Sequence, residues 1–304
     1  MNPFASRPEE IPDTDQYVDV PFYGRYFPTP DDFRIDTQYV NSQSARSLQY
    51  WASVLGLCDQ SVRIYPADEG GRDVFALGSI IIKSSHLHEG VDGRHTEIDY
   101  SYADANEIQA IALARSVLRD MNVRVPQIYF AGKINGRQVL VQERIPGVGL
   151  NVARRYLSQD QRNNFKQQTR ELIRRLHTIK PTDEHLARCH VVQDPDIFSN
   201  GRIGQLEADI LFSDANIDTD MSFMHNDLNE SNIIVDNDMI VGLVDWEMAG
   251  FFGWRTAGEV HRRIRTPQRE HFAAANLSEE ELQDIMWWAD IYDLPEPHED
   301  KPTH

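Results

Sequence analysis

Cysteine is almost absent from this chain, with only Cys58 and Cys189 among its 304 residues. Two cysteines so far apart form neither a disulfide framework nor a zinc-binding pattern, and we expect both thiols to stay reduced in a cytosolic setting. The chain also lacks any apolar run close to the about 20 residues that cross a bilayer. Its first residues contain neither the basic nor the apolar stretch of a secretory signal. We therefore expect a cytoplasmic protein without a membrane partner.

Positive charge is scarce: 30 Lys and Arg residues stand against 48 Asp and Glu residues, for a formal net charge of −18. Such an excess of negative charge repels a polyanion, so we expect no nucleic-acid partner. It would attract a cationic substrate, but net charge speaks mainly to solubility, and we favour that simpler interpretation. The content of 40% hydrophobic and 26% charged residues is typical of a globular protein with a substantial core.

Strand-like segments concentrate in the first half of the chain. Residues 1–55 are rich in Pro, Asp and aromatic residues and are interpreted as an arm that packs on the body, with a short helix at 42–55. From 56 to 146, five runs rich in β-branched and aromatic residues flank a helical pattern at 103–120. The runs are SVRIYPA, DVFALGS, SIIIKSS, QIYFAG and RQVLVQE. This part is predicted to be an antiparallel sheet with one helix.

The second half, 147–304, is predicted to be mainly helical. The tetrapeptides at 158–161 and 278–281 have the spacing of capping boxes, which predict helices running to Leu176 and Trp288. Between them, NIIVD and IVGLVD predict two short strands. The whole chain is therefore expected to be an α+β protein with two lobes, a small N-lobe at 56–146 and a mainly helical C-lobe at 147–304.

The most informative stretch surrounds these two strands. His225 to Asn232 fits H-x-D-L-x-x-x-N at every fixed position, and Asp245 ends the run IVGLVD. In phosphoryl transfer this spacing supplies a carboxylate for the acceptor hydroxyl, Asp227, and two ligands for Mg²⁺, Asn232 and Asp245. An Asp-Asn turn that caps a hairpin explains any one of these residues, but we favour the catalytic interpretation for the full pattern. His225 is interpreted as a hydrogen-bonding support for the loop.

This chemistry also needs a cation for the phosphates. Lys83 ends the strand-like run SIIIK, a position that resembles the strand lysine of kinases. A merely solvated lysine at a strand end is the alternative. Glu107, on the following helix, would be its ion-pair partner. The same stretch can also be interpreted as a capping box, Asp104-x-x-Glu107.

The order of a strand lysine, a helix glutamate, H-x-D-x-x-x-x-N and D-W-E resembles the aminoglycoside phosphotransferase and choline kinase-like family of small-molecule kinases, especially its fungal members. The resemblance covers residues 61–292. It implies a bilobal protein-kinase-like fold, ATP and Mg²⁺ as cofactors, and an acceptor hydroxyl on a small molecule such as an aminoglycoside, a choline-like amine, homoserine or methylthioribose. The segment VLVQERIPG is similar to the family's hinge, which implies adenine contacts near Gln142, Glu143 and Ile145.

The chain departs from the family pattern at several positions. Asn226 stands where the family usually has Gly. No G-x-G-x-x-G precedes Lys83, so Gly70 and Gly71 are the candidates to cover the phosphates, unless they form only a hairpin turn. The second motif continues with Trp-Glu and no A-P-E follows, which speaks against a protein kinase switched by activation-loop phosphorylation. Glu247 either joins the metal or orients its loop.

Two questions remain open, the role of an arginine-rich stretch and the function of the whole chain. The stretch 250–272 is rich in arginine within an acidic chain. It either binds an anionic acceptor or forms surface ion pairs, which we favour. The expected enzyme, which phosphorylates a small-molecule hydroxyl, competes with a nucleotide-binding pseudokinase or scaffold without turnover, and with nucleotidyl-transfer or lyase use of the same cleft. Nothing in the sequence indicates an oligomeric state.

Overall fold

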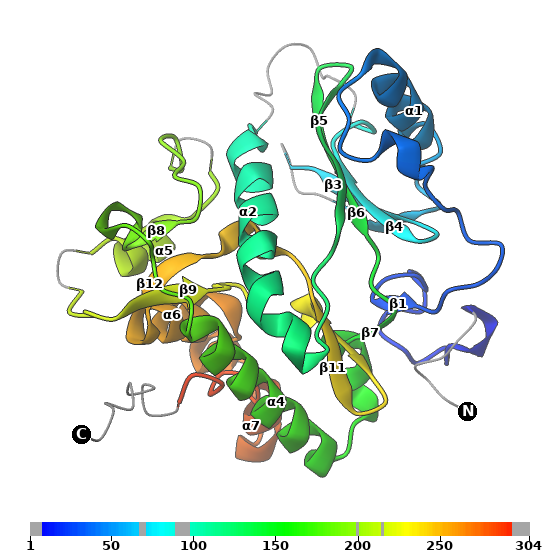
Figure 1. Ribbon diagram of the computed structural model, residues 1–304. Coiled ribbons are helices and arrows are strands. Elements are labelled where there is room, and N and C mark those ends of the chain that lie inside the picture. Colours follow the sequence, from blue (N-terminus) through cyan, green and yellow to red (C-terminus); the bar gives the residue numbers. More distant parts are fainter. Residues whose placement is uncertain (1–7, 67–70, 89–97, 199–200, 214–215, 294–304) are drawn as a thin grey trace.

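The smaller lobe is built on a five-stranded antiparallel sheet in the order β2-β3-β4-β6-β5 (Figure 1). The structure, a computed structural model, describes residues 8–66, 71–88, 98–198, 201–213 and 216–293. The strands of this sheet are β2 (Arg63–Tyr65), β3 (Asp73–Leu77), β4 (Ile80–Ser84), β5 (Ile128–Ile134) and β6 (Arg137–Glu143). All five predicted runs therefore contain strands.

Alternation along β4 decides which side chains face the other lobe. Ile80 and Ile82 are fully buried in the apolar cluster of the small lobe. Ile81 and Lys83 point the opposite way, because successive side chains of a strand alternate between the two faces. Lys83 pairs with Val74 of β3 in the strand register. The ordinary pleat of β4 thus carries its lysine to the face that lines the cavity described below.

A helix that the sequence assigned to the arm packs on this sheet. Helix α1 (Ala45–Leu55) begins at Ser44, whose hydroxyl accepts a hydrogen bond from the Ser47 amide. Trp51 of α1 is buried in the same apolar cluster as Phe130 of β5, with ring centroids 5.7 Å apart. Helix α1 therefore packs on this sheet in addition to the predicted helix at 103–120, and its apolar face covers the side that bears Ile80 and Ile82.

The second helix, α2 (Ser101–Leu118), connects the lobes. It covers most of the predicted 103–120 pattern. Its buried residues Ala110, Ile111 and Leu118 belong to the apolar core of the larger lobe. Asn106 donates two hydrogen bonds of 2.9 Å to the carbonyls of Glu247 and Ala249 in that lobe. The position of α2 is therefore set largely by the lobe that it faces.

The larger lobe contains two small sheets as well as helices. One has the order β1-β7-β10-β11 and the other the order β8-β12-β9. The predicted strands NIIVD and IVGLVD contain the antiparallel hairpin of β10 and β11. The strands are β1 (Arg25–Tyr26), β7 (Gly147–Gly149), β8 (Cys189–His190), β9 (Met221–Met224), β10 (Ile233–Asp236), β11 (Met239–Leu243) and β12 (Gly250–Gly253).

The helices of this lobe pack around the two sheets (Figure 1). They are α3 (Leu150–Ala153), α4 (Gln159–His177), α5 (Gln205–Leu211), α6 (Trp254–Val260), the π-helix η8 (His261–Arg265) and α7 (Glu279–Ile285). Short 3₁₀ helices are η1 (Pro8–Glu10), η2 (Thr37–Tyr39), η3 (Arg119–Met121), η4 (Arg154–Tyr156), η5 (Glu184–Leu186), η6 (Glu230–Asn232), η7 (Trp246–Met248) and η9 (Arg269–Phe272). No helix within the described ranges is both long and apolar enough to cross a membrane.

Both capping boxes predicted from the sequence are present, at the starts of α4 and α7. Helix α4 ends one residue beyond the predicted Leu176. Helix α7 ends at Ile285, three residues before the predicted Trp288. The indole of Trp288 donates a hydrogen bond of 2.8 Å to the Leu228 carbonyl instead of continuing a helical surface. Trp288 therefore lies beyond the end of α7 and contacts the loop that carries Leu228.

The segment before α1 runs along the hinge between the lobes. Strand β1 pairs with β7, and the Gly149 amide donates a 2.7 Å hydrogen bond to the Gly24 carbonyl. Gly24 has φ +60°, and a Cβ there would lie 2.7 Å from a Val152 methyl, so only glycine fits. Arg144 of the hinge donates to the carbonyls of Phe22 and Arg25. Backbone pairing therefore helps to fix this segment, together with Tyr17 and Tyr23, which pack against the core of the larger lobe.

A buried ion pair between Asp15 and Arg25 gives a stability prediction. Their atoms lie 2.7 Å apart, and each side chain is only 2% exposed. We expect Asp15→Ala to lower the free energy of unfolding by about 3–5 kcal/mol, because the Arg25 charge stays buried without its partner. Urea denaturation followed by tryptophan fluorescence measures this. The exposed Asp13 is the control, and Asp13→Ala should change stability by less than about 0.5 kcal/mol. Equal effects of the two changes would contradict the prediction.

Candidate active site

The loop after β9 is anchored by a neutral, fully buried histidine. The Asp227 amide donates to Nδ1 of His225 at 3.3 Å, so Nε2 carries the proton and donates to the Val244 carbonyl at 3.0 Å. Burial lowers the pKa of His225 to about 4. The imidazole therefore joins this loop to the end of the segment that carries Asp245, which fits the supporting position that the sequence indicated.

Asn226 occupies the loop position where the family usually has glycine, and its conformation shows why asparagine is tolerated there. Its φ is +61°, in the left-handed region, which asparagine tolerates better than most residues with a Cβ. Its side-chain amide also donates to the Met248 carbonyl at 3.2 Å. The substitution therefore keeps the turn and adds a contact to the loop that follows Asp245.

Asp227 lies at the centre of a set of hydrogen bonds. Its Oδ1 accepts from the Asn229 amide at 3.0 Å and lies 3.0 Å from Nε of Arg265. Its Oδ2 and its backbone carbonyl each accept from the Asn232 amide at 2.8 Å. Burial raises the pKa of Asp227 to about 7, while Arg265 acts in the opposite direction. A carboxylate with a pKa near neutrality can both accept and return a proton at physiological pH.

Lys83 connects three elements through buried ion pairs. Its Nζ lies 2.9 Å from Oε2 of Glu107 and 2.7 Å from Oδ1 of Asp245. Oε2 of Glu247 is 4.0 Å away. Burial by itself lowers the pKa of Lys83, but the charges of Asp245 and Glu107 raise it overall. The lysine is therefore charged, and it is not the solvated strand-end lysine that was the alternative.

The first turn of α2 corrects one interpretation of the sequence. The helix begins at Ser101, with Tyr100 before it and no side-chain cap, so Asp104 and Glu107 do not form a capping box. Asp104 instead pairs with NH1 of Arg72 at 2.6 Å. Both acids lie on the side of α2 that faces the cavity, and each holds a buried cation.

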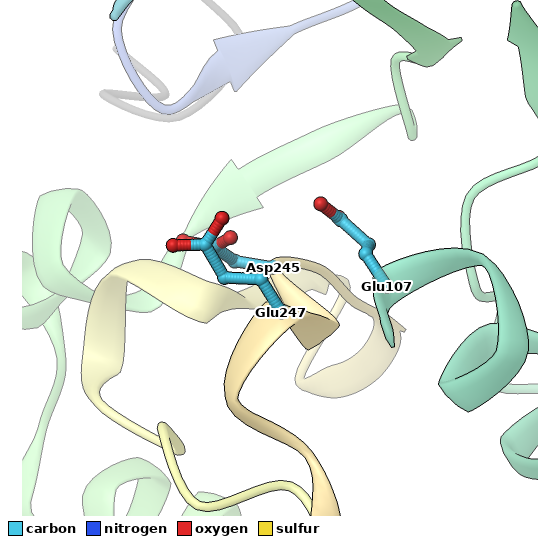
Figure 2. A group of neighbouring side chains, drawn as sticks. All are labelled: Glu107, Asp245 and Glu247. Atoms are coloured by element: carbon cyan, nitrogen blue, oxygen red, sulfur yellow. The ribbon is translucent and has the colours of Figure 1, made fainter. Parts of the chain in front are cut away.

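Three carboxylates from two segments converge beside this lysine. Figure 2 shows Glu107 extending from α2 and Asp245 and Glu247 extending from the loop after β11. One oxygen atom of each lies within 4.8 Å of the others. Asp245 has φ +64°, a strained conformation of the kind found at functional sites. Carboxylate oxygens at this spacing fit a hard divalent cation such as Mg²⁺.

The side chain of the predicted metal ligand Asn232 hydrogen-bonds to Asp227. Its amide nitrogen makes both bonds to Asp227, which leaves the amide oxygen as the atom that could face a cation. Burial raises the pKa of Asp245, but the charge and hydrogen bond of Lys83, together with Arg72, lower it overall, so Asp245 remains ionised. An ionised carboxylate and an amide oxygen are both suited to Mg²⁺.

A cavity of about 600 Å³ lies between the two lobes. Five of the polar residues described above line it: Lys83, Asp227, Asn232, Asp245 and Glu247. Its apolar wall comes from both lobes and consists of Val74, Ile81, Ile145, Ile234 and Val244. The volume suits a small-molecule ligand.

The predicted hinge residues Gln142, Glu143 and Ile145 all line this cavity. The backbone N–H of Glu143 already donates to the Gln127 carbonyl at 2.8 Å. Within the described ranges, the N–H of Ile145 has no hydrogen-bond partner. Ile145 is therefore the hinge residue best placed to donate to a ligand.

Of the two glycines predicted to cover the phosphates, only Gly71 is among the residues that the structure describes. Gly71 lines the cavity, whereas Gly70 lies outside the described residues. The next residue, Arg72, also lines the cavity and is buried. Arg72 was not among the predicted site residues, although it directly follows the glycine pair and precedes a predicted strand.

The arginine-rich stretch divides into two parts. Arg262, Arg263 and Arg269 form ion pairs in which their side chains are at least 41% exposed, as the favoured interpretation expected. Arg265 differs, because it pairs with Asp227 and with Glu207. This position was not predicted, because nothing in the local sequence distinguishes Arg265 from the neighbouring arginines.

One comparison with known proteins identifies the family. A model of the phosphotransferase enzyme family (APH) matches residues 99–257. The chain belongs to this family. The match includes Glu107, the loop from His225 to Asn232, and Asp245. No curated protein matches the chain.

Several solved structures are similar to the chain. The streptomycin–ATP complex of APH(2'')-IIa has a TM-score of 0.43 and 12% identity, over 75% of this chain and 78% of that one. APH(3'')-Id from Streptomyces rimosus has a TM-score of 0.44 and 17% identity, over 81% and 98%. ADP-bound APH(2'')-Ib has a TM-score of 0.42 and 12% identity, over 82% and 99%. The family assignment rests on the match of the family model.

The buried charge of Lys83 gives a prediction about stability and cations. We expect Lys83→Met to lower the free energy of unfolding by about 3–5 kcal/mol in EDTA, because Glu107 and Asp245 lose their shared counter-charge. Millimolar Mg²⁺ should restore part of this loss, since it binds the folded state through the same carboxylates. Chemical denaturation with and without Mg²⁺ measures both effects. Lys133→Met, at an exposed position, should show neither, and an unaltered stability of Lys83→Met would refute the prediction.

Proposed function

We propose that this protein transfers the γ-phosphoryl group of ATP to a hydroxyl of a small molecule. The observation that carries the proposal is the convergence of Lys83, Asp227 and the carboxylates of Asp245 and Glu247 in the lining of a 600 Å³ cavity. Membership of a phosphotransferase family supports the same reaction class. This reaction demands positioning and neutralisation of charge more than covalent chemistry from the protein.

Each residue of the site has a proposed role. Asp227 accepts the proton of the acceptor hydroxyl, with its carboxylate oriented by Asn229 and Asn232. Lys83 neutralises phosphate charge, and Glu107 holds Lys83 in position. The apolar wall and the N–H of Ile145 receive the adenine ring. His225 supports the loop.

The proposed divalent cation is Mg²⁺, held by Asp245 together with Asn232, with Glu247 as a further carboxylate. When bound, it supplies charge neutralisation between phosphate oxygens. Without a metal ion, Lys83 and Arg72 supply the positive charge that pairs with Asp245 and Glu247. The proposed division of the chain is an arm at 1–55, a nucleotide-binding N-lobe at 56–146 and a C-lobe at 147–304 that carries the acceptor side.

A nucleotide-binding protein without turnover is the competing function. The lack of a glycine-rich phosphate loop favours it. The oriented Asp227, whose two oxygens both have hydrogen-bond donors, argues against it, because a protein that only binds nucleotide has no need of a base.

The decisive experiment separates binding from turnover. We expect Mg²⁺-ATP to raise the melting temperature of the wild-type protein and to be converted to ADP, first with water as acceptor and faster with a hydroxyl compound from an acceptor panel. Asp227→Asn should still bind ATP but lose about 10²–10⁴-fold in ADP formation. Asp236→Asn, at an exposed position, is the matched control. ATP binding without ADP from any acceptor would favour the competing function, and AMP as product would reveal nucleotidyl transfer.

The pKa of Asp227 predicts the pH dependence of this activity. A base must be deprotonated to accept a proton, so activity falls as pH drops through a pKa of about 7. We expect kcat/KM for ADP formation to decrease about tenfold for each pH unit below that value. Initial rates of ADP formation between pH 5.5 and 8.5 measure this. A profile that stays flat down to pH 5.5 would show that Asp227 does not titrate as the base.

A further inference from the structure

Arg72 is a second buried cation in the lining of the cavity. Its side chain is 5% exposed, and it lines the same cavity as Lys83. Burying a guanidinium is costly unless it is paired. Asp104, 2.6 Å away, pairs with the guanidinium and offsets part of this cost. The face of the Tyr100 ring, 4.2 Å from the guanidinium carbon, offsets a further part. These contacts hold the group in place.

The strand register brings Arg72 and Lys83 together. Arg72 directly precedes β3, two residues before Val74, so the two share one face of the strand. Val74 pairs with Lys83 across the sheet, which makes Arg72 and Lys83 diagonal neighbours. Both cations also approach the same atom, Oε2 of Glu247, at 3.5 Å for Arg72 and 4.0 Å for Lys83. The two positive charges therefore form one site.

The surrounding sequence lacks what usually contacts phosphates in this position. A glycine-rich loop supplies backbone N–H groups, but this chain has no G-x-G-x-x-G before Lys83. A guanidinium presents several N–H donors in a planar fork that matches phosphate oxygens. Arg72 occupies the position that directly follows the glycine pair, and its side chain offers such donors.

We propose that Arg72 binds the β- and γ-phosphates of the nucleotide together with Lys83, in place of a glycine-rich loop. This inference rests on the proposed function, because it concerns the same nucleotide. In the free protein, ion pairs with Asp104 and Glu247 hold the guanidinium beside the cavity, in the position from which it would contact the phosphates. The alternative is a purely structural role, in which Arg72 only ties α2 to the loop that carries Glu247.

Binding measurements with nucleotides of different phosphate content distinguish the two roles. Titration calorimetry with Mg²⁺ and ATP, ADP, AMP or adenosine gives the affinity of each. We expect Arg72→Gln to weaken ATP binding about 10- to 100-fold, the effect of losing a charged hydrogen bond or two. Binding of AMP and adenosine should change less than about threefold. Arg72→Lys, which keeps the charge but not the fork, should lie between.

Two further variants keep the test independent of folding. Arg72→Gln leaves Asp104 buried without its cation, so Arg72→Gln combined with Asp104→Asn removes both charges and should restore stability without restoring ATP affinity. Arg46→Gln, at an exposed position of α1 in the same lobe, should bind all four ligands like the wild type.

The outcomes separate this inference from the proposed function. If Arg72→Gln weakens ATP and adenosine equally, or leaves ATP affinity unchanged while the wild type binds and converts ATP, Arg72 is structural and only this inference fails. If the wild type binds no ATP, the proposed function fails and the role of Arg72 fails with it. A loss confined to ligands with several phosphates supports the phosphate site.

Discussion

The buried ammonium of Lys83 joins three segments that lie far apart in the sequence. It pairs with Glu107 of α2 and with Asp245 of the loop after β11, and it projects from the central strand β4. A buried charge must be matched by opposite charge at close range. The sheet, the helix and the loop are therefore held to one arrangement, which is the arrangement that gathers the carboxylates at the cavity. The same interaction serves the fold and prepares the site.

The charges around this lysine do not balance, and the imbalance has chemical consequences. Lys83 and Arg72 face Asp104, Glu107, Asp245 and Glu247, so the carboxylates outnumber the cations. Like charges held close together repel each other and favour either protonation or a bound cation. A site with this excess accepts a divalent metal readily, and a metal in turn offsets the charge of a polyphosphate. The negatively charged site and a polyphosphate would repel each other. The proposed metal ion makes the two complementary, because its positive charge lies between the carboxylates and the phosphates.

How much of this could be inferred from sequence differs from residue to residue. The strands of the small lobe and the hairpin that ends near Asp245 follow local patterns, so they were predictable from periodicity and turn residues. The positions of Lys83 and Asp227 were predictable because their spacing to other polar residues is characteristic. Arg72 and Arg265 were not, since each depends on contacts with residues more than 30 positions away. The arm was predicted to pack on the body, but its strand β1 was not, because pairing by backbone hydrogen bonds over two residues leaves no side-chain pattern.

Several residues of the proposed site lie outside the stretch that the family model matches. The match covers 99–257, which contains the proposed base Asp227 and the acidic loop but neither Lys83 nor Arg72. Lys83 and Arg72 precede it, while Arg265, which pairs with Asp227, follows it. Trp288, further still, contacts the loop that carries Asp227 through the Leu228 carbonyl. The geometry of the proposed site therefore depends on contacts made from both sides of the matched stretch, by Lys83 and Arg72 before it and by Arg265 and Trp288 after it.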